Sequence, residues 1–557
     1  MPALSLSTVA EAVTFAASDW PDHGYTFQNL SGEETTRTFP AIERDSAARA
    51  SALQRLGLKK GDRVALVIIE PEDFVLTFFA AIRLGVIAVP LYPPPVPGDV
   101  AAYRQRTARI LQAAAPAALV APSSLVSLFT SLADEGAPVR QIVAVESVRS
   151  GTGTADFPTL STEDVAFLQF TSGSTSDPRG VLVTHACLLA NARAIAGPSG
   201  LDVDPRRDRG VTWLPLYHDM GLVGFVIASM CIGVPVVFIP TMRFLRNPAV
   251  WMETIHRHRG TISFGPNFSY ALVTRQATGD RLQRWDLSCV RVLGCGGEPV
   301  NPNVIRAFTR VFRDTGLRDD VVRPAYGLAE GTLTTAVTPP CHGMKTWRVD
   351  AKRFQEEGIA ESAREGRSAL EHVSVGRVIA EHEVTIADEE GSPLPDGHEG
   401  EVIVRGPSVT PGYFDNPEAS AEVFRSGVLH TGDVGYIHDG WLYITGRSKD
   451  LIIHNGRNIH PQAIEWVAEQ VDGTRKGNVV AVSVPGEETE RIVVVIETRA
   501  RRDDALISRV KTAVQQELSL PVADVVCLRR GELPKTSSGK VQRQLTRRHY
   551  LAGALGG

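Results

Sequence analysis

A loop rich in glycine and hydroxyl side chains is the first segment whose composition suggests chemistry. Residues 171–180 read TSGSTSDPRG, between the apolar run 165–170 and a helical pattern that begins near His185. Glycines let a backbone approach phosphate oxygens closely, while hydroxyls and a guanidinium add donors and charge. The GxxxxGK[ST] pattern of a P-loop is absent. A flexible linker is the alternative, but we interpret the loop as a phosphate site with the candidates Thr171, Ser172, Gly173, Ser174, Thr175, Arg179 and Gly180.

Two further segments could bind the rest of a nucleotide. In RPAYGLAE, Tyr326 offers a flat face for stacking on a base, and Glu330 offers a hard oxygen ligand for Mg2+. In HTGDVGYIHDGWLYITGR, Asp433 could accept hydrogen bonds from two ribose hydroxyls while Arg447 donates to them. Taken alone, the first segment is also compatible with a surface turn, and the second with a salt bridge.

Two more segments carry groups that could act on a bound nucleotide. LPKTSSGKVQR, near the C-terminus, places Lys540 on a Ser/Gly loop that could reach an active site from a second domain. LPLYHDMG places His218 beside Asp219 directly after an apolar strand pattern. A solvated tail loop and a structural histidine are the respective alternatives.

The five segments together fit one chemical problem. When a carboxylate attacks the α-phosphorus of ATP, both reactants are anions. A catalyst therefore needs backbone N–H groups around phosphate, a divalent cation, and a mobile positive charge where negative charge develops.

Short apolar runs that alternate with helical patterns must position these segments. This rhythm predicts parallel sheets with helices on their faces. Strands are expected at about 61–69, 86–89, 141–145, 211–214, 236–239, 261–264 and 290–293, with a helix at 74–84 between the first two. Short strands at 401–405, 434–438 and 441–445 predict a smaller antiparallel unit. Beyond 446 we expect a compact α+β module with helices at 461–470 and 503–518, a hairpin of 478–484 with 491–498, and a strand at 524–528.

Length and composition limit the class of protein. The chain has 557 residues, too many for one ordinary core, and 43% of them are apolar, as in globular proteins. A net charge of −5 gives no reason to expect a nucleic-acid or membrane partner. The 6 cysteines lack metal-site spacing, and the N-terminus lacks a secretory signal, so we expect a cytoplasmic protein with reduced thiols. The uncharged stretch 220–242 is interrupted by Gly and Pro and predicts a buried helix followed by a strand, not a membrane span.

The five segments, in this order, resemble the superfamily of acyl-CoA synthetases, nonribosomal-peptide adenylation domains and luciferases, from about Phe27 to Arg547. The sequence looks most like the fatty acyl-AMP ligases. That likeness is carried by FLQFTSGSTSDPRGVLVTHACLLAN, WLPLYHDMGL, FGPNFSYAL, RPAYGLAEGTL and SKDLIIHNGRNIHPQAIE. The resemblance implies an α/β fold: a large N-terminal domain, 1–446, of two α/β sheets plus a small antiparallel β-barrel-like subdomain. A small, mobile α+β C-terminal domain, 447–557, would follow.

The resemblance also implies a role for each matching residue. Thr175 and Glu330 would lie near Mg2+, and Asp433 and Arg447 would hold the ribose of ATP. His218, Glu330 and Lys540 would be catalytic, with Lys540 binding carboxylate and phosphate oxygens. Lys449 would be the hinge of the C-terminal domain. The adenine site would comprise Gly296, Gly297, Glu298, Pro299, Ala325, Tyr326 and Gly327.

Two residues depart from the family pattern, and one segment bears on the acyl acceptor. Ser176 stands where the family usually has Gly, and Arg179 where it usually has Lys. The segment at about 339–372 looks like the insertion of the ligases, which disfavours the CoA-forming arrangement. A separate acyl carrier protein, in polyketide, nonribosomal-peptide or lipid biosynthesis, would then accept the acyl group of a fatty or other apolar acid. The alternatives are an acyl-CoA ligase and, more remotely, a non-catalytic nucleotide-binding scaffold.

Overall fold

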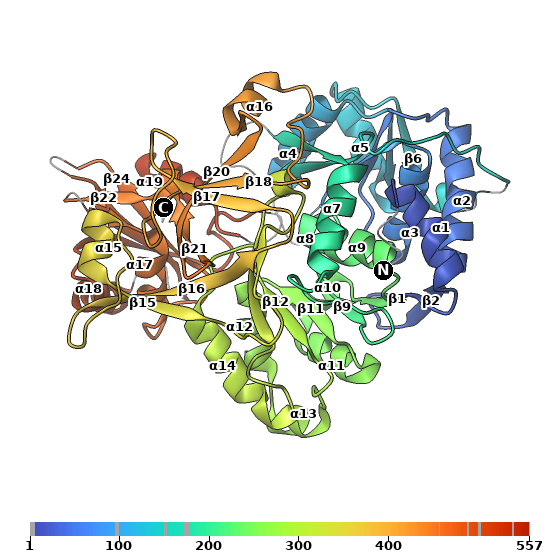
Figure 1. The fold of residues 1–557 in the computed structure, drawn as a ribbon. Coiled ribbons are helices and arrows are strands. Elements are labelled where there is room, and N and C mark those ends of the chain that lie inside the picture. Colours follow the sequence, from blue (N-terminus) through green and yellow to red (C-terminus); the bar gives the residue numbers. More distant parts are fainter. Residues whose placement is uncertain are drawn as a thin grey trace.

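The structure is a computed structural model. It describes residues 6–94, 100–149, 151, 153–171, 178–455, 457–486, 489–499, 503–536 and 540–555. Figure 1 shows N-terminal helices and strands on one side, a second α/β region below them, and the C-terminal elements on the opposite side. Antiparallel strands lie between the C-terminal elements and the two α/β regions (Figure 1).

The first sheet is formed early in the chain and has the strand order β6-β5-β3-β4-β7-β8. Its neighbours are parallel except β7 and β8, which form an antiparallel hairpin. The strands are β3 (Arg63–Leu66), β4 (Ile87–Pro90), β5 (Ala118–Ala121), β6 (Gln141–Ala144), β7 (Val165–Thr171) and β8 (Arg179–Thr184). The helices of this region are α1 (Val9–Asp19), α2 (Phe39–Arg55), α3 (Pro71–Arg83), α4 (Val100–Ala114), α5 (Ser123–Asp134), α6 (Val145–Arg149) and α7 (His185–Ala196).

Strand β8 is a difference from the sequence-based expectation. The helix does begin at His185, but a strand separates it from the glycine-rich loop. The apolar and β-branched residues of RGVLVT pair with β7, with Thr171 opposite Arg179 and Phe170 opposite Gly180. The loop is therefore the connection of a hairpin and does not lead directly into a helix.

The second sheet continues the α/β pattern with the order β13-β12-β11-β9-β10-β1-β2. All pairs are parallel except β1 with β2, at the edge. The strands are β1 (Gly24–Gln28), β2 (Glu34–Thr38), β9 (Gly210–Thr212), β10 (Val236–Phe238), β11 (Ile262–Gly265), β12 (Val292–Cys295) and β13 (Val322–Tyr326). Its helices are α8 (Asp219–Gly221), η2 (Leu222–Ile227), α9 (Ala228–Ile232), α10 (Thr241–Arg246), α11 (Ala249–His258), α12 (Asn267–Gln276), α13 (Gly279–Arg284), α14 (Pro302–Phe312), η3 (Arg313–Thr315) and η4 (Ala329–Gly331).

The uncharged stretch 220–242 folds as a buried helix and strand, as predicted. A π-helical turn, η2, joins the short helices α8 and α9, and Gly233 ends the helix in the left-handed conformation at φ 89°. Strand β10 follows with every residue buried. Among the residues that the structure describes, no helix is both long and apolar enough to cross a membrane.

Antiparallel strands extend the second sheet in the order β17-β18-β20-β21-β16-β14, and β14 pairs with β13. They are β14 (Ala336–Val337), β15 (Thr346–Asp350), β16 (Ala369–Val378), β17 (Glu383–Ala387), β18 (Gly400–Arg405), β19 (Phe424–Arg425), β20 (Val428–His438) and β21 (Trp441–Arg447). The helices here are α15 (Ala351–Glu357) and α16 (Pro417–Val423). Strand β15 and helix α15 come from the predicted insertion, and they bury Val349 and Phe354 against Tyr436 and Trp441.

The C-terminal part has a hydrophobic core of its own, which includes Ile464, Val494 and Val510. Its sheet has the order β24-β25-β26, and β22 pairs with β23 beside it. The elements are η5 (Ser448–Asp450), β22 (Ile452–His454), β23 (Arg457–Ile459), α17 (Pro461–Glu469), β24 (Val479–Val484), β25 (Arg491–Glu497), α18 (Asp504–Leu518), β26 (Val522–Leu528) and α19 (Arg543–Leu551). We call residues 448–555 the C-terminal module.

Candidate active site

A cavity of about 2430 Å³ lies between the two parallel sheets, the antiparallel strands and the C-terminal module. Its walls include the segments that follow the carboxyl ends of β3, β4, β9, β10, β11, β12 and β13. Ligands of open α/β sheets bind at this end of the strands. The predicted residues that line the cavity are Arg179, His218, Gly296, Gly297, Glu298, Pro299, Ala325, Tyr326, Gly327, Glu330, Asp433, Arg447, Lys449 and Lys540.

The glycine-rich loop connects β7 to β8 beside this cavity. Residues 172–177, which include the predicted Ser172, Gly173, Ser174, Thr175 and the unusual Ser176, lie outside the described residues. The strand ends that hold the loop are described. Arg179 lines the cavity, and its guanidinium lies 3.4 Å from a carboxylate oxygen of Glu422 and over the ring of Tyr413. The backbone carbonyl of Gly180 accepts a hydrogen bond of 2.8 Å from the N–H of Phe414.

Asp433 and Arg447 are held together by strand pairing. They are opposite each other in the β20–β21 ladder, and Arg447 Nε lies 2.9 Å from Asp433 Oδ1. The Asp433 charge, against a smaller opposing effect of burial, raises the pKa of Arg447. The hydroxyl of Tyr326 donates to the other oxygen, Asp433 Oδ2, at 2.6 Å. The sequence had suggested only a ring face for Tyr326, so its link to the predicted ribose residues is an addition from the structure.

The predicted adenine segment 296–299 forms the loop after β12. Gly297 has φ +80°, a conformation that favours glycine, and a side chain on Gly327 would clash with the Leu333 carbonyl, 1.6 Å from the β-carbon position. Glu298 accepts a hydrogen bond of 3.1 Å from the N–H of Phe268, in the first turn of α12. Burial raises the pKa of Glu298, and Lys540 and Lys535 only partly offset this effect.

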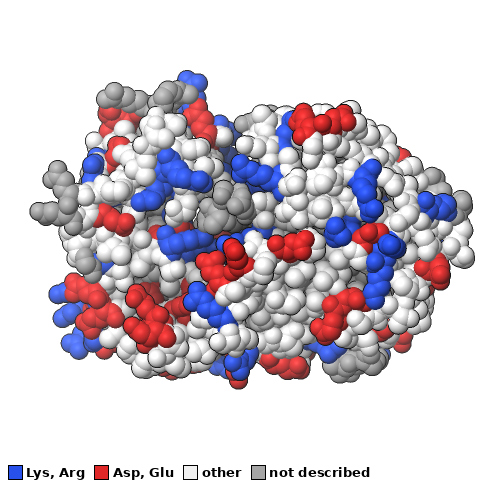
Figure 2. All heavy atoms as spheres, turned by 90° about the horizontal axis from the view of Figure 1, so that it is seen from above, with Lys and Arg blue, Asp and Glu red and all other residues white. Residues whose placement is uncertain are grey.

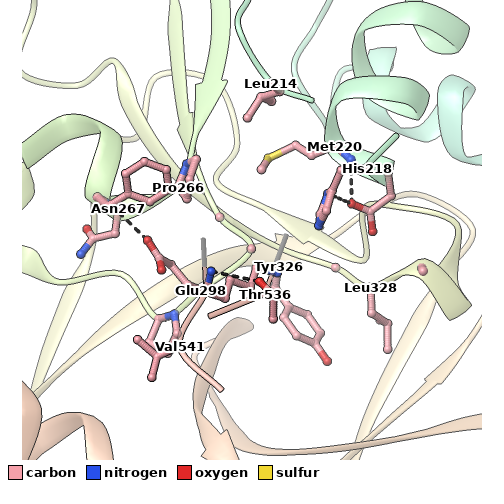
Figure 3. Close-up of a pocket in the computed structure, with 18 of the residues that line it drawn as sticks. Leu214, His218, Met220, Pro266, Asn267, Glu298, Tyr326, Leu328, Thr536 and Val541 are labelled. Carbon is pink, nitrogen blue, oxygen red and sulfur yellow. Dashed lines mark hydrogen bonds and ion pairs between the residues drawn. The ribbon is translucent and has the colours of Figure 1, made fainter. Parts of the chain in front are cut away.

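Lys540 enters the cavity from the C-terminal module. Its Nζ would be 3.7 Å from a β-carbon on Gly297, next to the adenine segment. The N–H of Thr536 donates to the Lys540 carbonyl at 2.7 Å, and the N–H of Lys540 donates to Thr536 Oγ1 at 3.1 Å. Figure 3 shows Thr536 and Val541 of this module on one side of the pocket, near Glu298 and Tyr326.

His218 and Asp219 lie against each other in the segment that follows β9. His218 Nδ1 lies 2.5 Å from Asp219 Oδ1, and the histidine ring points into the pocket (Figure 3). Burial by itself would raise the pKa of Asp219, but His218, with Lys540 nearby, outweighs burial and lowers that pKa. The pair is therefore electrostatically satisfied, and Asp219 is already engaged by an imidazole.

Glu330 is half-buried in η4, just after β13, and its surroundings include residues that sequence reasoning missed. The hydroxyl of Tyr413 donates to Glu330 Oε1 at 2.7 Å. Buried Asn191 holds the same loop, since its Nδ2 donates to the Thr334 carbonyl at 2.9 Å and to Ser408 Oγ at 3.0 Å. A carboxylate that lines the cavity, and whose second oxygen has no hydrogen-bond partner among the described residues, fits Mg2+. The other predicted metal ligand, Thr175, is outside the described residues.

Lys449 lies in η5, between the last strand of the antiparallel region and β22. Burial lowers the pKa of its ammonium most, and neighbouring Arg447 lowers it further. The Lys449 carbonyl accepts a hydrogen bond of 3.2 Å from Gln544 Nε2. The predicted hinge residue therefore lies between two structural regions, in contact with both the ribose pair and α19.

The fold and the cavity together are those of adenylate-forming enzymes. A family model described as "AMP-binding enzyme" matches residues 14–414, and the chain belongs to this family. The fold predicted from the sequence, a large α/β region of two sheets with antiparallel strands, is confirmed by this match and by similar solved structures.

Full-length relatives support the closer resemblance. The chain is 36% identical to a putative acyl-CoA synthetase of Caulobacter vibrioides, over 99% of this chain and 96% of the relative. It is 32% identical to the long-chain-fatty-acid–AMP ligase FadD32 of Mycolicibacterium smegmatis, over 99% and 95%. A solved structure from a study of fatty acyl-adenylate ligases from E. coli and L. pneumophila has a TM-score of 0.91 and 33% identity, and 99% of each chain is covered. The resemblance to fatty acyl-AMP ligases is thereby confirmed.

Proposed function

We propose that this protein is a fatty acyl-AMP ligase. A carboxylate oxygen of a fatty or other apolar acid attacks the α-phosphorus of ATP, the bond to the β-phosphate oxygen breaks, and acyl-AMP and pyrophosphate leave. The thiol of a phosphopantetheine arm on a separate carrier protein then attacks the acyl carbon and releases AMP. The observation that carries this proposal is that Lys540, Glu330 and the Asp433–Arg447 pair line one cavity at the carboxyl ends of two parallel sheets.

Each group has a role that its position supports. Asp433 accepts hydrogen bonds from ribose hydroxyls and is oriented for this by Arg447 and Tyr326. The loop after β12 provides the adenine site. The Lys540 ammonium, beside Gly297, balances the negative charge that develops as two anions react. His218, oriented by Asp219, lies beside the acyl-phosphate group.

Mg2+ belongs to the proposal as the divalent cation bound by ATP phosphates. Glu330 would hold it together with a hydroxyl of the glycine-rich loop, predicted to be that of Thr175. When bound, the cation neutralises phosphate charge and orients the leaving pyrophosphate. The protein itself positions the Glu330 carboxylate. Arg179, at the end of the glycine-rich loop, adds a positive charge near the phosphates.

An apolar acid is favoured by the cavity wall on the side of η2, β11 and α12. Leu214, Met220 and Pro266 face the pocket in Figure 3, and Phe225 and Phe264 also line it. Adenylating enzymes for amino acids need a carboxylate for the substrate amine. Of the acids near this wall, Asp219 is already paired with His218, and Glu298 accepts a hydrogen bond from the N–H of Phe268. A hydrocarbon chain would gain free energy from burial against such a wall.

A carrier-protein acceptor is favoured by the packing of the insertion, 339–372. Its helix α15 lies against the C-terminal module: Arg457 Nε donates to Gln355 Oε1 at 3.1 Å, and the ring of Phe354 lies 6.0 Å from that of His460. These contacts oppose the rotation at Lys449 that a CoA-forming arrangement would require. We also propose a domain boundary near 446, with a mobile module beyond it, because the C-terminal module has a hydrophobic core of its own.

The proposal is tested by measuring pyrophosphate release over a panel of acids from C2 to C18, with ATP and Mg2+. Mass spectrometry should detect the acyl-AMP of an apolar acid and its transfer to a holo carrier protein. The absence of acyl-AMP with every acid would overturn the proposal and favour a non-catalytic nucleotide-binding protein.

An acyl-CoA ligase is the second candidate, favoured by the name of the Caulobacter vibrioides relative. Incubation with ATP, the acid and free CoA separates the two. Acyl-CoA formed as fast as acyl-carrier protein would support the CoA ligase. Under the main proposal, CoA is a poor acceptor, and deletion of about 347–370 increases acyl-CoA formation.

A further inference from the structure

A short segment at 410–414, TPGYF, connects the two sheets at the cavity. On one side it continues the β7–β8 hairpin. The N–H of Leu182 donates to the Gly412 carbonyl at 3.0 Å, the N–H of Phe414 donates to the Gly180 carbonyl at 2.8 Å, and Val181 pairs with Tyr413. The backbone of Tyr413 is therefore attached to the strand that leaves the glycine-rich loop.

On its other side the segment is attached to Glu330, which belongs to the second sheet region. The N–H of Thr410 donates to the Glu330 carbonyl at 2.9 Å, and the Tyr413 hydroxyl donates to Glu330 Oε1 at 2.7 Å. Tyr413 is only 5% exposed, so its hydroxyl has little competition from water. Both the main chain and the carboxylate of Glu330 are thus held by one segment.

The ring of Tyr413 has a second contact, with Arg179 at the end of the loop. The guanidinium carbon lies 5.4 Å from the ring centroid, within the range of a cation–π interaction. The same guanidinium lies near Glu422 of α16, so Arg179 is held between a ring face and a carboxylate. The backbone N–H of Tyr413 donates to Ser420 Oγ at 2.9 Å, which attaches the Tyr413 backbone to the α16 segment as well.

We propose that Tyr413 is a positioning residue for the metal ligand. Its hydroxyl orients the Glu330 carboxylate, and its backbone fixes that carboxylate relative to strand β8, which follows the glycine-rich loop. The phenol donates to one carboxylate oxygen, and the other would be available to the cation that Glu330 would hold. This inference rests on the proposed function, because it takes Glu330 as a ligand of the magnesium bound with ATP.

Tyr413→Phe tests the inference because it removes the hydroxyl and keeps the ring. Loss of a group that orients a metal ligand costs about 10–100-fold in metal affinity. Binding of Mn2+ in the presence of a non-hydrolysable ATP analogue, followed by electron paramagnetic resonance, should weaken by that factor. The Mg2+ concentration for half-maximal pyrophosphate release should rise in parallel, while saturating Mg2+ restores kcat and the KM of the acid stays unchanged. Rescue by Mg2+ cannot occur in a misfolded enzyme.

Two further variants sharpen the test. Tyr443→Phe removes a buried hydroxyl that has no hydrogen-bond partner among the described residues, and it should leave both titrations at the wild-type values. Tyr413→Leu also removes the ring beneath Arg179, and it should raise the KM of ATP in addition.

Unchanged Mn2+ and Mg2+ titrations for Tyr413→Phe, in an enzyme whose Glu330→Gln variant does shift, would overturn the inference and leave the proposed function intact. A wild-type protein without Mg2+-dependent acyl-AMP formation would instead overturn the proposed function, and the inference with it.

Discussion

The proposed ribose end and the proposed phosphate end of the cavity are built in different ways. At the ribose end, Asp433 and Arg447 face each other on paired strands, and Tyr326 completes a hydrogen-bonded group without any ligand. At the phosphate end, the parts come from separate units: Glu330 from η4, Arg179 from the β7–β8 hairpin and Lys540 from the C-terminal module. Figure 2 shows Lys and Arg side chains on both halves of the upper face, several of them near its centre.

This difference separates residues that recognise the nucleotide from residues that act on the reacting atoms. A rigid, preformed group binds substrate and transition state about equally, which lowers KM without raising kcat. Groups that meet only when several units are correctly placed can act on charge that develops in the transition state. We therefore expect variants of the two ends to change different kinetic constants.

Lys540→Ala should have the largest effect. Loss of a charge that stabilises the transition state lowers kcat by about 10²–10³-fold or more, with little change in the KM of ATP. Initial rates of pyrophosphate release over an ATP series measure both constants. Lys59→Ala, which truncates an exposed lysine outside the cavity, is the matched control. Near-normal kcat in Lys540→Ala would refute its catalytic role.

Asp433→Asn should have the next largest effect, at the other end. Hydrogen bonds to charged groups contribute about 1.5–3 kcal/mol, so the KM of ATP should rise by about 10–100-fold with a smaller fall in kcat. Asp439→Asn makes the same change at an exposed position between β20 and β21, and it should leave KM unaltered. If Asp433→Asn lowered kcat alone, the preformed recognition site that we describe would be wrong.

Arg179→Lys should have a moderate effect at the phosphate end. Lysine retains the charge but presents a compact ammonium in place of the planar guanidinium that lies over Tyr413. We expect the KM of ATP to change by about two- to fivefold, with kcat nearly constant, since cation–π contacts contribute about 0.5–1 kcal/mol at exposed sites. A fall in kcat comparable with that of Lys540→Ala would show that the guanidinium itself takes part in the chemistry.

Gln355→Ala should have the smallest effect on adenylation, because Gln355 lies in the insertion and lines the cavity without a proposed role in the reaction. Its loss removes the hydrogen bond from Arg457 and should let the C-terminal module move more easily. Adenylation should stay within about twofold of wild type, while trypsin cleavage around 447–449 becomes faster, by up to about tenfold. Unchanged cleavage would argue that this contact does not restrain the module.

The residue types of the site, and most of the helices and strands that carry them, could be predicted from local sequence patterns. Composition and strand periodicity are local properties, so the sequence alone was enough to identify the segments 171–180, 323–330 and 430–447. The same local signals predicted the buried helix and strand of 220–242 and the hairpin formed by β24 and β25, and the structure contains both.

How these residues meet depends on the fold of the whole chain. The hydrogen bond from Tyr413 to Glu330 joins residues 83 positions apart in the sequence, and the one from Tyr326 to Asp433 joins residues 107 positions apart. No sequence pattern indicated that Asp433 is the partner of the Tyr326 hydroxyl. Strand β8 was not predicted, because the six residues RGVLVT could also belong to a loop before a helix. Pairing with β7 decides in favour of a strand. Local patterns report which face of a segment is buried. Which distant segment covers that face depends on packing between sheets, and only the folded chain specifies it.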